Sequence, residues 1–320
     1  MGNMSKVHFL QSEAWAGFQR ALGHKVFAKA GRGWSYMAVL ETGRGNTRLY
    51  CPYGPVCTND DAFEEAILSL KDLGREQGAT FLRIEPTGSV TKKAVQKMGC
   101  KEVLYNQLQP AQTQIITLAN KTEDEILAGM QSNNRNLYRA YAKKGLAMRE
   151  SSDSADVAIF LRFIHKVAGR TGLRPHSDEY FKKQAASLFR TGAAKLFYAE
   201  YEGRPIAASI VYDDETTRYY AHAAADDDFR KLSAGTALVT YMIIDAMKSG
   251  KKEFDLFGIA PKSPEEDPRH AWAGFTKFKQ RFGGERREYV GTWDIPLRPG
   301  KYYGYKAYQT LNNIRRNRRK

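Results

Sequence analysis

The stretch Leu238-Val-Thr-Tyr-Met-Ile-Ile-Asp-Ala-Met247 is followed closely by Lys251-Lys-Glu-Phe-Asp-Leu-Phe-Gly-Ile259. The first stretch repeats its apolar residues at helical spacing, and the second is typical of a buried strand. Three alternating segments, 197–201, 206–212 and 217–224, precede them and predict a strand meander. Residues 197–259 therefore predict an α/β unit built from a meander, a helix and a further strand.

The first half of the chain repeats this order of elements. Short strand-like segments lead to a helix predicted over residues 60–78, and residues 81–86 follow as a strand. The sequence thus predicts two tandem copies of one α/β unit, without a repeat at the level of residues. We assign residues 1–147 and 298–320 to the first domain and 148–297 to the second, with the polar segment 145–153 at the boundary.

Composition and charge restrict the class of protein. The chain has 320 residues, 42% of them hydrophobic, and a net charge of +15, which is typical of a globular protein with polyanionic partners such as RNA, nucleotide phosphates or an anionic membrane surface. Three cysteines without a CxxC pair favour a reducing compartment. The histidines are scattered, and we expect neither a metal nor a cofactor.

The sequence contains no stretch close to the ~20 apolar residues of a membrane span. The first residues, Met1–Lys6, lack the apolar core of a secretory signal. We therefore expect a soluble cytoplasmic protein, and a monomer.

The segment Gly274-Phe-Thr-Lys-Phe-Lys-Gln-Arg-Phe-Gly-Gly-Glu285 is the candidate for chemistry. Lysines beside a glycine pair suit a site for an anion or an acyl group, because glycines let backbone N–H groups approach a ligand closely. The alternative is an amphipathic helix carrying three phenylalanines at helical spacing and ending at Gly283. Spacing alone favours the helix.

The second half resembles a GNAT (acetyltransferase-type) unit. The match is the meander followed by Gly235-Thr-Ala237 and then by the helix and strand. In that fold, backbone amides at the helix start hold a pyrophosphate. Leu232 and Ser233 interrupt the usual glycine spacing, so coenzyme A is not expected here.

The whole chain resembles the Fem (FemX/FemAB) aminoacyltransferases of peptidoglycan synthesis. The matching stretches lie in order and span nearly the full length: Phe9–Trp15, Tyr53–Val56, Arg83–Pro86, Thr171–Arg174 with Tyr180, Phe254–Ile259, and Gly274–Gly284 followed by Tyr289–Pro296. The resemblance implies an α/β fold of two tandem GNAT-like domains. The coiled-coil arm of some family members has no counterpart in this sequence.

The resemblance also implies a reaction. An aminoacyl-tRNA would give its amino acid to an amine on the peptide stem of UDP-MurNAc-pentapeptide or of a lipid-linked precursor. The neutral amine would attack the activated ester, and the tetrahedral oxyanion would need stabilisation.

Individual roles follow from the matching motifs. Lys279 would stabilise the oxyanion or hold the terminal phosphate and ribose of the tRNA, and Phe278 would position the acyl ester. Side chains for the diphosphate and sugar of the precursor would be Arg174, Tyr180, and Tyr220 or Tyr219. Further substrate-binding candidates are Gln19, which replaces a lysine of the family, Lys25, which could compensate for it, and Arg83.

Several of these residues have simpler interpretations. Tyr180 could only pack at a helix start, and Arg174 could be a surface residue beside Pro175. Asp226-Asp-Asp228 is interpreted as a solvated turn rather than a metal site. The basic tail, residues 315–320, would touch tRNA phosphates or an anionic membrane, or would be a solvated end.

Two other functions fit the same sequence. An acyl-CoA-dependent N-acyltransferase would bind coenzyme A at the Gly235 loop. A non-catalytic tRNA-binding protein would bind charged and uncharged tRNA alike.

Overall fold

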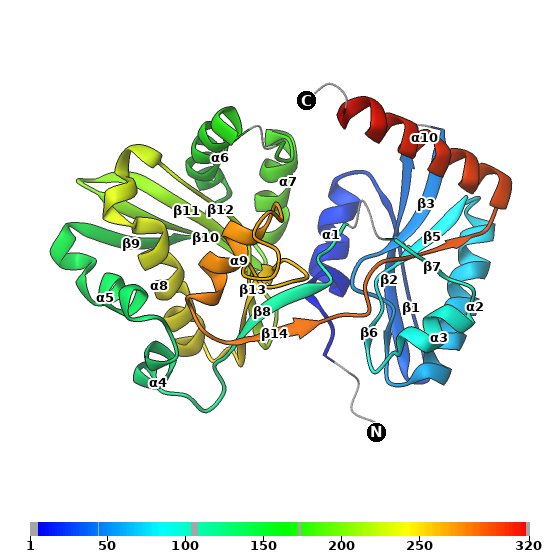
Figure 1. The fold of residues 1–320 in the computed structure, drawn as a ribbon, viewed down its shortest axis with the longest axis horizontal. Coiled ribbons are helices and arrows are strands. Elements are labelled where there is room, and N and C mark those ends of the chain that lie inside the picture. The colour runs from blue at the N-terminus through cyan, green and yellow to red at the C-terminus, as the bar shows by residue number, and fades with distance from the viewer. Residues whose placement is uncertain (1–5, 44, 104–107, 172–173, 318–320) are drawn as a thin grey trace. The chain divides into compact units, whose positions relative to one another are not determined.

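A computed structural model describes residues 6–43, 45–103, 108–171 and 174–317, and the chain divides into two units (Figure 1). Unit 1 comprises Met1–Ala111 and Tyr289–Lys320, and unit 2 comprises Gln112–Glu288. Each unit contains one sheet with helices packed on it. The α/β class and the absence of a coiled-coil arm, within the described residues, agree with the prediction.

The unit boundaries differ from those expected. Residues 112–147 belong to unit 2, because β8 (Gln112–Thr117) pairs with β13 (Glu253–Gly258) and β14 (Glu285–Glu288). The expected boundary segment contains β9 (Leu146–Ser151), an edge strand paired with β10 (Ala194–Tyr201). An edge strand with one wet side carries polar residues, which is why this segment resembled a linker.

Unit 1 holds an eight-stranded sheet with the order β6-β4-β2-β3-β5-β15-β7, and β1 pairs with β2. Its strands are β1 Lys25–Gly31, β2 Trp34–Gly43, β3 Asn46–Cys51, β4 Val56–Cys57, β5 Phe81–Ile84, β6 Thr87–Gly88, β7 Lys101–Glu102 and β15 Trp293–Pro296. Its helices are α1 Glu13–Ala21, α2 Asp60–Glu76, α3 Lys92–Lys97 and α10 Pro299–Asn317, with the 3-10 turn η1 at Phe9–Gln11. The strand expected near Leu104 lies outside the described residues.

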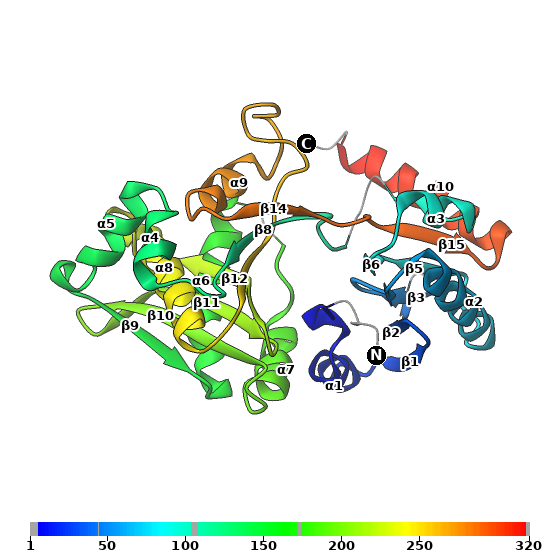
Figure 2. The same ribbon diagram turned by 90° about the horizontal axis from the view of Figure 1, so that it is seen from below.

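Unit 2 holds a seven-stranded sheet with the order β14-β8-β13-β12-β11-β10-β9. The remaining strands are β11 Arg204–Asp213 and β12 Thr217–Ala225, and the α-helices are α4 Glu123–Ala128, α5 Ser132–Ala140, α6 Val157–Thr171, α7 Asp178–Leu188, α8 Ala234–Lys248 and α9 Ala273–Gln280. Three 3-10 turns complete the unit: η2 Ala142–Lys144, η3 Ser154–Asp156 and η4 Asp227–Leu232. Helices α4, α5 and α8 pack on one side of the sheet, with α8 at the centre of the core, while α6 and α7 cover the other side (Figure 2).

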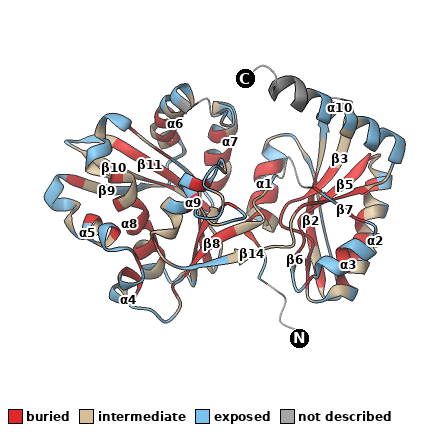
Figure 3. Cartoon of the chain, in the orientation of Figure 1, coloured by how far each residue is buried: buried red, intermediate tan, exposed pale blue. Residues whose placement is uncertain are grey.

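The predicted repeat of elements is present in both units. In each, an antiparallel meander leads through a long helix into a strand that pairs in parallel with the last strand of the meander: β3 with β5 across α2, and β12 with β13 across α8. Helix α2 buries one apolar face, whereas α8 is buried over most of its circumference (Figure 3). The expected capping box at Thr122 and Glu125 starts α4, and Ser177 caps α7.

Within the described part of the chain, no helix is both long enough and apolar enough to cross a membrane.

Candidate functional site

The centre of unit 2 is the place where two parallel strands stop pairing. Strands β12 and β13 pair from Thr217 and Glu253 as far as Tyr219 and Asp255, although both strands continue. The pairing of β12 with β11 also shifts after Tyr220, leaving Ala221 without a pairing partner on β11. Such a bulge turns the neighbouring side chains to new directions and interrupts the ladder. A gap between strands therefore opens inside the sheet.

Asp255 is buried at the point of separation. Its carboxylate accepts hydrogen bonds from the hydroxyl of Thr113 and from the backbone N–H of Phe257, the latter at 2.7 Å. Burial raises the pKa of Asp255 to about 6, against the opposing effect of these hydrogen bonds and of nearby Lys279 and Arg287. Phe257 has a φ of 62°, a left-handed conformation that is uncommon for a bulky residue. The strand end is thus held in a strained conformation around a carboxylate.

Helix α9 is fastened to this strand end. The backbone N–H of Ala260 donates to the buried hydroxyl of Thr276 at 2.8 Å, and the Nζ of Lys279 donates to the carbonyl oxygen of Gly258 at 2.7 Å. Burial lowers the pKa of Lys279 to about 8, and attraction to Asp255 opposes this decrease. At neutral pH the site therefore combines a mostly charged ammonium group with surroundings of low polarity.

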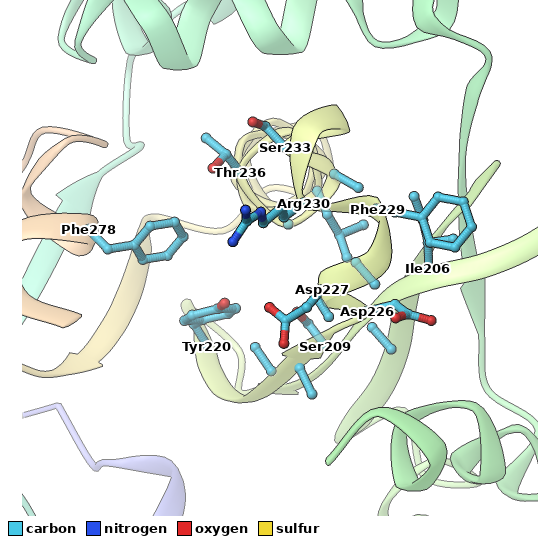
Figure 4. Close-up of a pocket in the computed structure, with 18 residues that line it drawn as sticks. Ile206, Ser209, Tyr220, Asp226, Asp227, Phe229, Arg230, Ser233, Thr236 and Phe278 are labelled. Carbon is cyan, nitrogen blue, oxygen red and sulfur yellow. The ribbon is translucent and has the colours of Figure 1, made fainter. Parts of the chain in front are cut away.

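A cavity of about 350 Å³ lies beside this helix, entirely within unit 2 (Figure 4). Its walls come from β11, β12, η4, the start of α8, and Phe278 of α9. Phe278 and Tyr220 lie at one end, and the side chain of Arg230 projects between them and the start of α8. Small residues form much of the remaining wall: Ala207, Ala208, Ala223, Ala224, Ala225, Ala234 and Gly235.

The start of α8 has the features of an anion site. Ser233 adopts a left-handed conformation with a φ of 52°, and no side chain caps the helix. Backbone N–H groups at a helix N-terminus favour negative charge. Among the described residues, Arg230 forms no ion pair with a carboxylate, so its guanidinium is available to the same cavity.

Asp226 holds the loop that carries Arg230, and it corrects the prediction of a solvated turn. Its carboxylate is buried, and the Nζ of Lys166 lies 2.9 Å and 3.0 Å from its two oxygens. The neighbouring Asp227 is exposed and pairs with Arg170 at 2.9 Å. Only the second and third carboxylates therefore match the expected solvated turn.

The glycine pair also has a different role from the one considered. A side-chain carbon at Gly283 would lie 2.4 Å from the carbonyl oxygen of Gly129, and one at Gly284 would lie 2.1 Å from that of Ile115. Both glycines have positive φ. They serve the close approach of the chain to its own backbone. The helix expected in this segment is present as α9, but it ends at Gln280 with Arg281 rather than Gly283 as its C-cap, and Phe275 is exposed.

Only two of the remaining candidates of unit 2 lie at the cavity. Tyr220 and Phe278 line it, whereas Tyr219 is buried elsewhere and donates to Asp214 at 2.7 Å. Tyr180 lies at the start of α7 and stacks on His176, with 3.9 Å between ring centroids. Arg174 is exposed in the segment before α7, and Gly172 and Leu173 of that motif lie outside the described residues.

The structure corrects two of the three candidates in unit 1. Arg83 is 2% exposed and binds both carboxylate oxygens of Asp294, at 2.8 Å and 2.9 Å. Gln19 is buried and its amide oxygen lies 2.9 Å from Nδ1 of His24, so it does not reach solvent as expected. Both side chains are buried within unit 1 and bind its own residues, whereas Lys25 is exposed at the start of β1.

Sequence analysis missed the role of Asp255 and Thr113. The signal for Asp255 was present, because a carboxylate stands inside the otherwise apolar Phe254–Ile259 run. No signal pointed to Thr113, which is 142 residues away and reaches Asp255 only because β8 and β13 are neighbours.

Known proteins share sequence and fold with this chain. The FemAB family model matches residues 182–312, from α7 to α10. The match covers part of the chain and supports the predicted resemblance to the Fem family. Among relatives, it is 21% identical to a lipid II:glycine glycyltransferase of Staphylococcus epidermidis, over 77% of this chain and 75% of the relative. It is 26% identical to the protein of that name from Staphylococcus aureus, over 79% and 70% of the two chains.

Solved structures support the fold assignment. The crystal structure of FemX superposes with a TM-score of 0.82 at 18% identity, covering 94% of this chain and 95% of that one. A tandem GNAT protein from the clavulanic acid biosynthesis pathway superposes with a TM-score of 0.52 at 12% identity, over 86% and 83% of the chains. The predicted α/β fold with two GNAT-like units is therefore confirmed.

Proposed function

We propose that this protein transfers an amino acid from an aminoacyl-tRNA to an amine on the peptide stem of a peptidoglycan precursor, forming part of an interpeptide bridge. The acceptor is UDP-MurNAc-pentapeptide or a lipid-linked precursor. Support comes from the relatives, which are named lipid II:glycine glycyltransferases, and from the chemistry available around Lys279.

The reaction forms one bond and breaks another. The neutral acceptor amine attacks the ester carbonyl carbon, and a C–N bond forms. The C–O bond to the ribose of the tRNA then breaks, and the proton lost by the amine ends on the ribose oxygen. Negative charge develops on the carbonyl oxygen in between, and a fixed cation in a poorly hydrated site stabilises that charge strongly.

Lys279 carries the proposal, because it is the charged group that fits this role. Its ammonium is anchored on Gly258 at 2.7 Å, and burial lowers its pKa to about 8. A lysine with this pKa keeps its charge at neutral pH while remaining weakly solvated, so it can respond to an oxyanion or a ribose phosphate. The ring of Phe278, next to it in sequence, supplies an apolar surface against which the acyl ester is positioned.

The cavity beside Phe278 suits the terminal part of the donor. The start of α8 and Arg230 provide an environment for a phosphate, and Tyr220 offers a ring at the same end as Phe278. The same features fit the pyrophosphate of coenzyme A, which makes an acyl-CoA-dependent N-acyltransferase the second candidate.

A transfer assay separates these candidates. The purified protein is mixed with a pool of aminoacyl-tRNAs and either acceptor, and the mass of the acceptor is followed for the wild type, Lys279→Ala and Lys277→Ala. Lys277 is the matched control, since it lies on the same helix and is exposed. We expect a gain of one amino-acid residue that is lost in Lys279→Ala and kept in Lys277→Ala.

Two results would overturn the proposal. Consumption of acetyl-CoA, with no transfer to either acceptor, would support the N-acyltransferase. Equal binding of charged and uncharged tRNA, with no transfer and no acyl-CoA consumption, would identify a non-catalytic tRNA-binding protein.

A further inference from the structure

The last helix of unit 1 has an apolar face that the rest of the described part of unit 1 leaves exposed. Tyr303, Tyr308 and Leu311 of α10 are 56%, 50% and 58% exposed. They are three of the eight large apolar side chains that are exposed within the described residues. Concentration in one helix distinguishes them from the single exposed apolar residues that are normal on protein surfaces.

The opposite face of α10 attaches the helix to unit 1. The ring of Tyr302 packs edge-on against Phe81 at 5.3 Å, and its hydroxyl donates to Asp294 at 3.2 Å. Tyr305 stacks on the same phenylalanine at 5.9 Å. These contacts fix the rotation of the helix about its axis, so the exposed face has a defined direction.

The exposed face is a continuous apolar arc. With about 100° per residue, positions 300, 303, 304, 307, 308 and 311 fall within about 140° of each other, and all six are exposed. They are glycine, tyrosine, glycine, alanine, tyrosine and leucine. Between positions 300 and 311 no charged residue lies in this arc, and the first charged position in line with it is Arg315, beyond Leu311. Figure 3 colours most of the described part of the helix as exposed.

The charge around this arc has one sign. Residues 298–320 contain eight lysines and arginines and no aspartate or glutamate. Arg298 and Lys301 stand at the start of the helix, and the chain continues past the arc into residues 315–320, which contain five of the eight basic residues. The side chains of residues 312–320 lie outside the described residues, so only their composition enters here.

We propose that α10 is a membrane-docking helix that lies in the interface of a bilayer containing anionic lipids. An apolar face with tyrosine rings, flanked by basic residues and free of acidic ones, is the pattern of helices that lie in the headgroup region. An RNA backbone fits less well. Its phosphates would require cations at the middle of the exposed face, where the aliphatic side chain of Leu311 lies. This inference rests on α10 alone and does not depend on the proposed function.

Vesicle co-sedimentation of the full chain tests it. Vesicles of phosphatidylglycerol and phosphatidylcholine are compared with vesicles of phosphatidylcholine alone, for the wild type, Tyr303→Gln/Leu311→Gln and Leu68→Gln. Leu68 is the matched control, because it lies on α2 of the same unit and is 57% exposed. Urea unfolding of each variant confirms an unchanged fold.

We expect the wild type to bind the anionic vesicles, more weakly at high salt. The double variant should lose about tenfold or more in binding, since two apolar side chains no longer enter the interface, whereas Leu68→Gln should bind like the wild type. Absence of vesicle binding, or equal binding by the double variant, would overturn the proposal. Two other results would also overturn it, because the face would then bind another partner. One is a wild-type dimer that becomes a monomer in the double variant. The other is a double variant that loses RNA binding but keeps vesicle binding.

Discussion

Replacing Lys279 by methionine keeps an unbranched side chain of nearly the same length and removes its charge. If the ammonium stabilises the oxyanion, the rate constant for transfer should fall by about 10²- to 10³-fold, the usual cost of losing one such donor. The stability of the folded protein should instead increase. The pKa of Lys279 lies about 2.5 below its ordinary value of 10.5, so holding the charge at neutral pH costs the folded state about 3 kcal/mol.

The sign of this cost determines its dependence on pH. A lowered pKa in the folded state means that the folded protein binds the proton less well than the unfolded chain. Wild-type stability should therefore rise between pH 8 and pH 10.5, and Lys279→Met should lack this rise. At pH 7 the variant should be more stable by about 1 to 2 kcal/mol, after subtraction of the lost hydrogen bond to Gly258.

The rate supplies a second magnitude. With a pKa of about 8, the lysine is mostly charged at pH 7 and mostly neutral at pH 9. The acceptor amine also titrates, so the useful quantity is the ratio of the wild-type rate to that of Lys279→Arg, whose charge does not change in this range. This ratio should fall about tenfold between pH 7 and pH 9.

The assay is transfer under single-turnover conditions, with urea unfolding measured in parallel. A Lys279→Met variant that keeps its transfer rate within about threefold of wild type would refute the role of the charge. If the ratio of the wild-type rate to that of Lys279→Arg stays constant from pH 7 to pH 9, the lysine does not titrate in this range. This conclusion would hold even if Lys279→Met is inactive.

Three further predictions concern the supporting structure. Gly284→Ala should destabilise unit 2 by about 2 to 4 kcal/mol in urea unfolding, because its new carbon meets a backbone oxygen at 2.1 Å; Gly274→Ala, in an open helical position of the same segment, should be neutral or slightly stabilising. Arg83→Met should cost about 3 to 5 kcal/mol in the same measurement by removing the guanidinium that binds both oxygens of the buried Asp294 carboxylate, and a cost below about 1 kcal/mol would contradict the assignment of a buried ion pair. Asp255→Asn should move the high-pH limit of transfer, read against the Lys279→Arg variant, below pH 8, since its carboxylate raises the pKa of the lysine; an unchanged limit would exclude that influence.

Local sequence signals predicted the elements of this protein well. The helix expected over residues 60–78 is α2, Asp60–Glu76, with its apolar face in the core, and the capping box at Thr122 starts α4 as expected. These features depend on residues a few positions apart, so the local sequence contains the necessary information.

Features that depend on residues far apart in the chain could not be predicted from the sequence. Arg83 resembled a ligand-binding arginine because Asp294, its partner, lies 211 residues away. Gly283 and Gly284 resembled a ligand loop because the backbone that crowds them belongs to distant segments, the C-cap of α4 and strand β8. Lys279 and Phe278 came from family resemblance, and their position beside the separated strands became clear only from the sheet pairing.

The place of β15 in its sheet has a consequence for the order of events during synthesis. β15 lies between β5 and β7, yet its residues follow the whole of unit 2 in the chain. Since a nascent chain emerges from its N-terminus, unit 2 can complete its sheet before residue 293 exists, while the first 111 residues wait with a missing inner strand. A chain that stops after Glu288 should therefore contain a folded unit 2 attached to an incomplete unit 1, which makes unit 1 the part most exposed to proteolysis and aggregation until translation ends.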